Sequence, residues 1–337
     1  MARYILRRLL LALPALLGLV VLTFVLSRVV PADPAATLAG DAATPALIAE
    51  IRAQYGLDRP ILEQAVIHVR QVMTGDFGRS VFSGRPVAEE ILQRLPATLE
   101  LTFAALFIAT LLGIPLGLVA ALHHNGVVDN LVRVLSVGGL AIASFWLAIM
   151  LQLLFSMELD ILPLRGRIDV ALGMPPRVTG FVLIDSLIAG RPDMFLDGCR
   201  HLLLPAITLS LPGLATIARF TRSGVLETLQ KDFVLYARAA GYGRIRLAAI
   251  YVLRNAVTLV VTQVGLLFGA LISGAVAVEA IFDWPGLGTY AVQAILSADY
   301  KALLAVTLVV GVVYAVVNVL VDVAQVVIDP RVAEDGR

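Results

Sequence analysis

The sequence has few of the residues that usually carry redox, metal or acid–base chemistry. Cys199 is the one cysteine in 337 residues, which excludes an internal disulfide and a cluster of cysteine metal ligands. The four histidines are His68, His201 and the neighbours His123 and His124, and no nucleophile–base set is visible around them. The composition therefore gives no indication of an enzyme.

Lysine is almost absent, and the charges nearly cancel. Lys231 and Lys301 are the only lysines, and neither follows a glycine, so the Gly-Lys pair of a Walker A motif is missing. The chain therefore cannot bind ATP through a P-loop of its own, and we expect no cofactor or metal on it. With a net charge of +1, there is also no electrostatic case for binding nucleic acid.

Apolar residues, by contrast, are abundant. They make up 59% of the chain, with 15% charged residues and a mean hydropathy of +0.90, whereas soluble domains have about 45–50% apolar residues. Uncharged runs of about the 17–25 residues that a bilayer span requires predict an all-α integral membrane protein with six transmembrane helices. These runs are 9–27, 101–122, 134–157, 202–218, 256–278 and 302–321. The fourth run is short and holds Pro205 and Pro212, which membrane helices tolerate when neighbours satisfy the freed carbonyl groups.

The first run follows three arginines, Arg3, Arg7 and Arg8, an order that a signal peptide shares. The run is too long for a signal peptide and no small-residue cleavage site closes it, so we favour a first transmembrane helix with a cytoplasmic N-terminus. Residues 31–96 form a polar segment. Within it, Pro60 and Gly75 bound a predicted amphipathic helix.

The distribution of basic residues predicts the orientation of the chain. The loop 219–255 contains more basic than acidic residues: Arg219, Arg222, Lys231, Arg238, Arg244, Arg246 and Arg254 against Glu227 and Asp232. The loops 30–97 and 157–200 have at least as many acids as bases. Because basic loops stay in the cytoplasm, we predict that 123–133, 219–255 and both termini are cytoplasmic.

Residues 229–256 are the long polar and basic interruption in the second half of the chain. Asp232 is a suitable N-cap, and Gly241 stands where a left-handed residue would end a short helix. Helical spacing places four residues on one face: Phe233, Tyr236, Ala237 and Ala240. A short helix cannot bury such a face alone. Periodicity leaves open whether the partner is the lipid headgroup layer or another protein.

This stretch resembles the cytoplasmic coupling loop of permease subunits in binding-protein-dependent ABC importers of the dipeptide, oligopeptide and nickel kind. The family has a Glu-Ala-Ala-three-residues-Gly pattern. Here Leu235, Tyr236, Ala237 and Gly241 occupy the matching positions, so the Glu and the first Ala are absent and the second Ala and the Gly are kept. Other segments that carry the resemblance are PADP at 31–34, 75–101, LRNA at 253–256, and Asn318, Asp322 and DPR at 329–331.

The resemblance implies the transmembrane domain of a type I ABC importer, with an N-terminal helix and outer segment at 1–93, a core at 94–327 and a cytoplasmic tail at 328–337. It implies that the helix in the coupling loop 219–255 inserts into a groove on an ATPase subunit. The residues that it assigns to this contact are Phe233, Tyr236, Ala237, Arg238, Ala239, Ala240 and Gly241.

Further implications of the resemblance concern partners and function. We expect a paralogous second permease subunit, two ATPase subunits that hold ATP and Mg²⁺, and an extracytoplasmic substrate-binding protein. The complex would lie among the lipids of a bacterial or archaeal cytoplasmic membrane. The chain would form half of the translocation pathway of an importer for di- or oligopeptides, with a nickel complex, glutathione and sugars as open alternatives.

Two polar or small-residue patterns lie within the predicted spans. Gly265, Gly269, Ser273 and Ala277 recur every fourth residue, which suits ordinary packing in the bundle or a seam with the second permease. Asn318, Asp322 and Gln325 share a face of the last span. Their two interpretations are an ion or proton site and hydrogen bonding to the neighbouring coupling loop.

The segment 279–288 is predicted to lie outside the membrane, where Pro-Gly favours a tight turn. In the family it lines the outer part of the pathway, and the alternative is a plain outer loop. The resemblance thus makes these residues a candidate outer gate: Glu279, Phe282, Asp283, Trp284, Pro285 and Gly286. On this interpretation, Trp284→Ala should alter substrate entry without weakening contact with the ATPase.

The alternative class of function is a secondary transporter or channel driven by an ion gradient. It predicts paired charges within the membrane and often internal repeats, whereas we find one acid near a helix end and no obvious repeat. The Ile-Ser-Gly at 272–274 is similar to the serine motif of rhomboid proteases. Those enzymes need a histidine on a later membrane helix, and no histidine follows His201.

Overall fold

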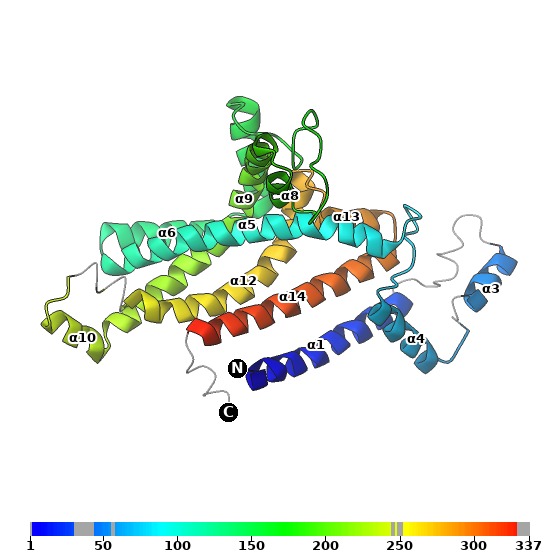
Figure 1. The fold of residues 1–337 in the computed structure, drawn as a ribbon, viewed down its shortest axis with the longest axis horizontal. Coiled ribbons are helices and arrows are strands. Elements are labelled where there is room, and N and C mark those ends of the chain that lie inside the picture. Colours follow the sequence, from blue (N-terminus) through cyan, green and yellow to red (C-terminus); the bar gives the residue numbers. More distant parts are fainter. Residues whose placement is uncertain (1, 30–43, 55–57, 244–246, 248–251, 329–337) are drawn as a thin grey trace. The chain divides into compact units, whose positions relative to one another are not determined.

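The computed structural model describes residues 2–29, 44–54, 58–243, 247 and 252–328. Within these ranges the regular structure is helical, with one isolated bridge between Arg79 and Pro86 (Figure 1). The helices are α1 (Ala2–Val29), α3 (Pro45–Gln54), α4 (Ile61–Thr74), α5 (Val87–Leu122), α6 (Val127–Ala141), α7 (Ser144–Gln152), the π-helix η2 (Leu153–Glu158), α8 (Val182–Ile188), α9 (Pro192–Leu229), α10 (Asp232–Ala239), α12 (Leu253–Ile281), α13 (Leu287–Leu296) and α14 (Tyr300–Ile328).

The chain divides into two compact units. The core unit comprises residues 1–4, 95–289 and 316–337, and the N-terminal unit comprises residues 5–94 and 290–315. The boundaries fall inside α1, α5, α13 and α14, so each of these helices contributes a part to both units.

Five of the described helices are long and apolar enough to cross a membrane. A sixth candidate is the pair Val127–Ala141 and Ser144–Glu158, if the two helices cross as one span. The all-α prediction is confirmed, and the six-span count agrees with this upper number. The five single spans are Leu10–Ser27, Val87–Leu122, Pro192–Leu229, Val260–Ile281 and Tyr300–Val327.

The third predicted run, 134–157, is not one continuous helix but is divided between α6 and the pair α7 and η2. Its two helices meet at a bend of 98°. Ile142 and Ala143 are extended, and the N–H of Ile142 donates to the carbonyl of Gly138 at 3.0 Å, which closes α6. Glycine is a poor helix former, and Gly138 and Gly139 precede the break. Because every residue around the break is uncharged, hydropathy alone could not reveal it.

The fourth span is much longer than the predicted run 202–218. It is the middle of α9, a helix of 38 residues that begins with Pro192 in its first turn and contains Pro205 and Pro212. Residues 219–229, which we assigned to a loop, continue this helix. The basic residues Arg219 and Arg222 therefore stand on a rigid element.

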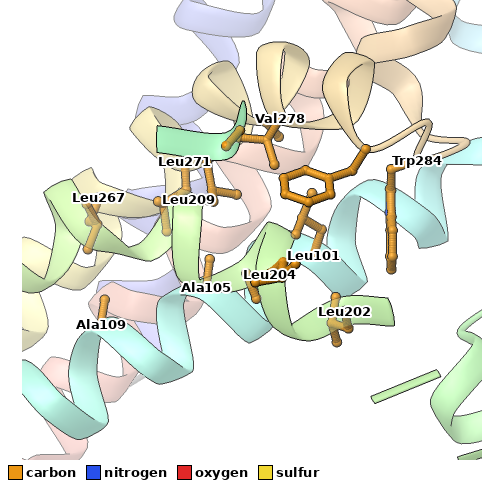
Figure 2. Packing of buried hydrophobic residues seen from close by; sticks show 14 of the residues in the cluster. Leu101, Ala105, Ala109, Leu202, Leu204, Leu209, Leu267, Leu271, Val278 and Trp284 are labelled. Carbon is orange, nitrogen blue, oxygen red and sulfur yellow. The ribbon is translucent and has the colours of Figure 1, made fainter. Parts of the chain in front are cut away.

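The hydrophobic core of the core unit lies among α5, α9 and α12 (Figure 2). Leu101, Ala105 and Ala109 recur every fourth residue on α5 and are fully buried, so they form its inner face. A Cβ on Gly213 of α9 would lie 2.8 Å from Cδ2 of Leu267 on α12, so the two helices lie close together at this glycine. The other core residues that Figure 2 labels are Leu202, Leu204, Leu209, Leu271, Val278 and Trp284.

In the N-terminal unit, the helix predicted between Pro60 and Gly75 is confirmed as α4. Pro60 precedes its first residue, and Gly75 has the left-handed φ of +71° that ends it. None of the residues of α4 is buried in this chain. Ile61, Leu62, Val66 and Met73 are exposed apolar side chains.

Candidate coupling and translocation sites

The first candidate site is α10, an eight-residue helix that follows the end of α9 (Figure 1). Asp232 is its first residue rather than its N-cap, so the predicted start was wrong by one position, and Lys231 occupies the cap. The predicted end is confirmed. Gly241 has φ +82°, and its N–H donates to the carbonyl of Arg238 at 3.0 Å.

One face of α10 packs against the rest of the core unit. Val234 is fully buried and Ala237 is 7% exposed. They belong to a small cluster with Ala121 of α5, Val225 of α9 and Val252, which precedes α12. The cluster attaches α10 to three elements of the core unit, so the position of α10 depends on the positions of those elements.

The opposite face of α10 is exposed and partly aromatic. Tyr236 is 77% exposed, and Phe233 and Leu235 are exposed as well. Arg238, Ala239 and Ala240 also face outward. Of the four residues that helical spacing groups, Phe233, Tyr236 and Ala240 are exposed, whereas Ala237 packs in the cluster that attaches α10 to the core unit.

A buried carboxylate joins α6 to α9. Asp129 is fully buried and accepts from Nε of Arg222 at 2.6 Å and from its Nη2 at 2.8 Å. It also accepts from Nη2 of Arg133 at 3.1 Å and from the N–H of Asn125 at 2.9 Å. Two guanidinium groups and a backbone N–H thus surround one carboxylate, and this arrangement fixes the turn 123–126 to α9.

The backbones of α5 and α9 approach closely at the same end of the core unit. A Cβ on Gly117 would lie 2.4 Å from the carbonyl oxygen of Ala218 and 2.7 Å from Cβ of Thr221. Any side chain at 117 would force the two helices apart. Together with the Asp129–Arg222 pair, this contact makes the ends of α5, α6 and α9 one rigid support for α10.

Sequence reasoning did not identify Asp129 as a site residue and counted Arg222 only as a basic loop residue. The signal in the sequence is weak: Asp129 is the single acid of the turn 123–133, and Arg133 follows it by four residues. The partner Arg222 is 93 residues away. Only packing brings the two together.

The second candidate site is the segment 279–288, which follows α12. Glu279 is fully buried, and its carboxylate accepts from Oγ1 of Thr98 at 2.6 Å and from the N–H of Thr289 at 3.0 Å. Thr98 in turn accepts from the N–H of Leu287 at 2.7 Å. The carboxylate is therefore held on both sides, by α5 and by the start of α13.

Two glycines make room for this carboxylate. A Cβ on Gly286 would lie 2.3 Å from Oε1 of Glu279, and a Cβ on Gly288 would lie 2.8 Å from its Oε2 and 2.6 Å from Cα of Val276. Neither glycine is in a left-handed conformation. The Pro-Gly-Leu-Gly sequence is thus needed for space around Glu279.

The aromatic residues of this segment are buried as well. Phe282 and Trp284 are each 1% exposed, and the indole N–H of Trp284 donates to the carbonyl of Ala97 at 2.8 Å. Among the six candidate gate residues, Asp283 and Pro285 are the exposed ones. Glu279, Phe282, Trp284 and Gly286 are buried in this chain and hold the segment in place.

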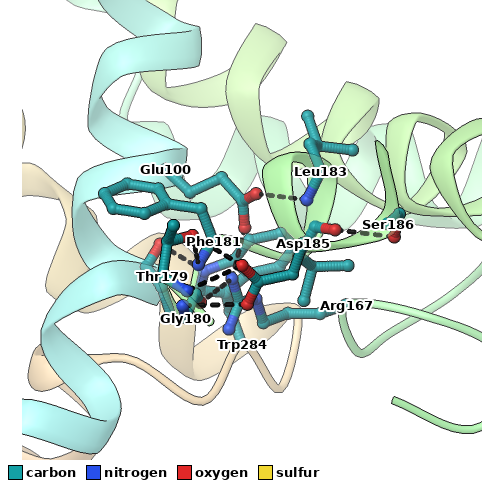
Figure 3. Close-up of polar contacts among 11 residues, drawn as sticks. Glu100, Arg167, Thr179, Gly180, Phe181, Leu183, Asp185, Ser186 and Trp284 are labelled. Atoms are coloured by element: carbon teal, nitrogen blue, oxygen red, sulfur yellow. Dashed lines mark hydrogen bonds and ion pairs between the residues drawn. The ribbon is translucent and has the colours of Figure 1, made fainter. Parts of the chain in front are cut away.

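The loop 159–191 is fastened to the same region (Figure 3). Arg167 forms a buried ion pair with Glu100 of α5, donates to the carbonyl of Gly180 at 3.2 Å, and lies over the ring of Trp284 at 5.4 Å from its centroid. Glu100 also accepts from the N–H of Leu183 at 2.9 Å. The loop 159–191 is therefore attached to α5 through a charged contact that excludes water.

Asp185 organises the next turn of this loop. Its carboxylate accepts from the N–H groups of Val178, Thr179 and Gly180 and from the hydroxyl of Thr179. Burial by itself would raise the pKa of Asp185, but these hydrogen bonds outweigh it, and the pKa lies below its usual value. Asp185 is therefore ionised at neutral pH.

Trp284→Ala should destabilise the core unit, so its effect should not be limited to substrate entry. The large buried side chain leaves a cavity, for which we expect a loss of about 3–5 kcal/mol of folding free energy. Trp284→Phe keeps most of the volume and loses the N–H, with an expected cost of about 1 kcal/mol. Thermal unfolding of the purified variants measures both. Equal stability of Trp284→Ala and the wild type would contradict the burial.

The small residues that recur every fourth position on α12 (Gly265, Gly269, Ser273 and Ala277) differ in how deeply they are buried. A Cβ on Gly265 would lie 3.0 Å from Cγ1 of Val321 on α14, so this glycine packs within the chain. Gly269 is partly buried, whereas Ser273 and Ala277 are exposed. The first interpretation, packing in the bundle, applies to Gly265. The exposed positions stay candidates for a seam.

The polar face of α14 points to α12. Gln325 donates to Oγ1 of Thr262 at 2.8 Å, and Oδ1 of Asn318 lies near the Gly265 position. Asp322 lies between them on the same face and is partly buried. Two of the three polar residues thus lie against α12, and hydrogen bonding of Asp322 to the coupling loop stays a prediction. Among the described residues, no group of three or more His, Cys, Asp or Glu side chains could hold a metal ion.

Comparison with known families decides the class of protein. Residues 113–334 match the family described as "Binding-protein-dependent transport system inner membrane component", and residues 1–102 match its N-terminal companion, "Binding-prot-dependent transport system membrane comp, N-term". The chain belongs to this family. It is a permease subunit of an ABC importer, a transport subunit whose ATPase activity lies in separate subunits.

Similar proteins cover nearly the whole permease. The "Probable D,D-dipeptide transport system permease protein DdpB" of Escherichia coli (strain K12) is 42% identical over 319 residues, 95% of this chain and 94% of that protein. The "Dipeptide transport system permease protein DppB" of the same strain is 39% identical over 335 residues, 98% of this chain and 99% of the other. The "Di/tripeptide transport system permease protein DppB" of Pseudomonas aeruginosa (strain UCBPP-PA14) is 39% identical over 333 residues, 98% and 99% of the two chains.

Membership of this family confirms the resemblance found in the motifs and places the permease in an inner membrane. It also implies a partner permease, ATPase subunits and a substrate-binding protein in general terms. The alternative of a transporter driven by an ion gradient finds no support.

Proposed function

We propose that this permease forms one half of the translocation pathway of an importer for dipeptides and other short peptides. The family supports the transport role, and the names of the full-length relatives support the peptide substrate. We further propose that α10 is the element that contacts an ATPase subunit.

The observation that carries the second part is the two-sided character of α10. Its inner residues Val234 and Ala237 attach it to the core unit, while Phe233, Leu235 and Tyr236 remain exposed on a helix too short to be stable alone. An exposed aromatic surface on a rigid support is suited to enter a groove on a partner protein. Arg238, Ala239 and Ala240 border this surface, and Gly241 ends it.

The proposed complex has a paralogous second permease, two ATPase subunits that bind ATP and Mg²⁺, and a substrate-binding protein on the outside. Both termini and α10 are cytoplasmic in this proposal. ATP binding closes the ATPase pair and moves α10. Since α10 is attached to α5, α9 and the start of α12, the movement reaches the bundle and opens the pathway outward. Hydrolysis returns the bundle to the inward state.

The burial of individual side chains narrows the set of residues that we propose for the outer gate and for the seam with the second permease. We propose that Asp283 and Pro285 border the outer pathway, and that Glu279, Phe282, Trp284 and Gly286 position the backbone that carries them. Ser273 and Ala277, with exposed small side chains on α12, are proposed to face the second permease, where they allow close helix approach.

Gly241→Asp tests the coupling role of α10. Aspartate, like asparagine, tolerates the left-handed conformation, so the change chiefly adds a negative charge at a helix C-terminus, which costs about 0.3–1 kcal/mol against the helix dipole and more where a partner buries the charge. Since about 1.4 kcal/mol corresponds to a factor of ten, we expect about a tenfold fall in the uptake of a labelled dipeptide by membranes that contain the complete complex. The ATPase subunits should also co-purify less with this variant.

The matched control is Gly241→Asn. Asparagine tolerates the left-handed conformation and adds no charge, and no atom lies within 4 Å of a Cβ at this position. It should therefore keep most of the uptake. Undiminished dipeptide uptake by Gly241→Asp, at normal amounts of protein in the membrane, would contradict the coupling role.

A further inference from the structure

The helix α4 carries an apolar strip that no part of the described chain covers. Leu62, Val66 and Met73 follow at positions i, i+4 and i+11, so they project in nearly the same direction from the helix. They are 79%, 68% and 83% exposed, and none of the residues of α4 is buried. A row of large apolar side chains in water is unfavourable, so we expect a partner to cover this strip.

The position of α4 beside the C-terminal end of α1 sets its level relative to the bilayer (Figure 1). The ring of His68 on α4 lies 5.6 Å from the ring of Phe24 on α1, measured between centroids. Phe24 precedes Ser27, the last residue of the apolar window Leu10–Ser27, by about 5 Å along the helix axis. Interfacial helices bury their apolar face about 5–10 Å into the boundary between headgroups and acyl chains. The contact with Phe24 therefore holds α4 at the depth of that boundary.

The surface of α1 next to this contact is apolar and exposed as well. Val25 and Leu26 follow Phe24 and are both exposed. Of the whole window Leu10–Ser27, 6% is buried within the chain. A membrane span with so little buried surface meets acyl chains over much of its length. The strip on α4 thus adjoins a surface that faces lipid.

The chemistry of the strip favours lipid over a protein partner. It contains no aromatic residue and no arginine, the types that are enriched at the centre of protein interfaces, and leucine and valine are under-represented among the residues that dominate binding there. Glu63 and Arg70 are exposed at the sides of the strip, where long charged side chains can reach lipid headgroups. Gln71 is exposed on the other side of the helix, toward water.

We propose that α4 lies in the headgroup layer of the bilayer and inserts Leu62, Val66 and Met73 among the acyl chains. The inference rests on the proposed function only for the side of the membrane. With both termini in the cytoplasm, the C-terminal end of α1 and the attached α4 are at the outer surface. The lipid contact would then hold the beginning of the segment 58–94 at that surface.

Site-specific photo-crosslinking identifies what covers the strip. The complete transport complex, with a diazirine-bearing amino acid at position 62, is placed in nanodiscs of phosphatidylethanolamine and phosphatidylglycerol together with the purified substrate-binding protein. After illumination, the mass of the permease should rise by that of one phospholipid. This adduct should be about fivefold or more as abundant as with the same amino acid at position 71. Leu62 and Gln71 are both exposed, so neither replacement disturbs the packing of the chain.

A charge placed in the strip tests the insertion itself. Val66→Asp should lower the yield of lipid adduct at position 62 by about threefold or more, because a carboxylate opposes entry into the acyl layer. Gln71→Asp is the matched control. It adds the same charge on the other side of α4 and should leave the yield unchanged. Size exclusion should show the same folded fraction for both variants, since both positions are exposed.

Equal yields of lipid adduct at positions 62 and 71 would overturn the proposal. A main adduct at position 62 with the substrate-binding protein or with the second permease would overturn it as well, because a protein would then cover the strip. An unchanged yield in Val66→Asp would show that the strip does not enter the acyl layer. Lipid adducts at position 62 in a complex that imports no dipeptide would instead contradict the proposed function and leave α4 at the membrane.

Discussion

Gly286→Ala should leave little folded permease in the membrane. The added Cβ would lie 2.3 Å from Oε1, 2.4 Å from Cδ and 2.5 Å from Oε2 of Glu279. The carboxylate cannot turn away freely, because Thr98 and Thr289 hold it from two elements. Overpacking in a rigid core typically costs about 1–3 kcal/mol and occasionally more. We expect about 3 kcal/mol here because the overlap is with a buried charged group.

Fluorescence-detected size exclusion of tagged variants measures the folded fraction, and thermal unfolding measures what remains. Gly138→Ala is the control, because it makes the same change on α6, where no atom lies within 4 Å of a Cβ. It should be neutral or slightly stabilising. A Gly286→Ala permease as abundant and as stable as Gly138→Ala would contradict the packing around Glu279.

A double-mutant cycle separates this overlap from a general effect of alanine. Glu279→Ala removes the group that Gly286→Ala would strike, although it also leaves Thr98 and Thr289 without their acceptor. In the Glu279→Ala background, Gly286→Ala should cost less than about 1 kcal/mol, since the two sites share one contact. Additive effects would show that the cost of Gly286→Ala arises elsewhere.

Asp129→Asn should be the second severe substitution, because it leaves Arg222 beside a neutral amide. Asp129 is fully buried, and the side chain of Arg222 is 18% exposed. Removal of one partner of a buried ion pair costs about 3–5 kcal/mol, and partial exposure of Arg222 places this case at about 3 kcal/mol. The loss should separate α6 from α9 and loosen the support of α10.

Two measurements distinguish this effect from loss of folding alone. The complex with Asp129→Asn should hydrolyse more ATP for each dipeptide imported, because α10 would move without the bundle, and its unfolding temperature should fall. Arg133→Ala is the control: this side chain is 52% exposed, and an exposed pair contributes about 0–1 kcal/mol. A normal ratio of ATP to peptide in Asp129→Asn would exclude Asp129 and Arg222 from the coupling path.

The segment 279–288, which we propose to border the outer pathway, is held by several contacts. Trp284, Phe282 and Glu279 are buried and joined to α5, and the Arg167–Glu100 pair ties the loop 159–191 to the same helix (Figure 3). A segment held by this many contacts moves with α5. Opening of the pathway on the outside would therefore involve the movement of whole helices, with Asp283 and Pro285 carried along.

The sequence by itself determined the class of the protein and most of its spans. A helix that spans a bilayer requires a long uncharged run, and a soluble domain does not tolerate so many of them. Composition and the length of these runs were therefore sufficient to predict an all-α membrane protein. Helix ends at Gly75 and Gly241 were also predictable. Glycine is strongly favoured in the left-handed conformation at those ends, and this requirement is local.

Only the tertiary structure decided the direction and the partners of individual side chains. A run of apolar residues has the same hydropathy whether it is straight or bent by 98°, so the break at Ile142 and Ala143 could not be read from it. Helical spacing assigned Ala237 to a surface that a partner would cover, whereas packing against α5 and α9 buries it within the chain. Asp129 and Arg222 are 93 residues apart, and Glu279 and Thr98 are 181 apart. Such contacts depend on how helices pack, which no local pattern encodes.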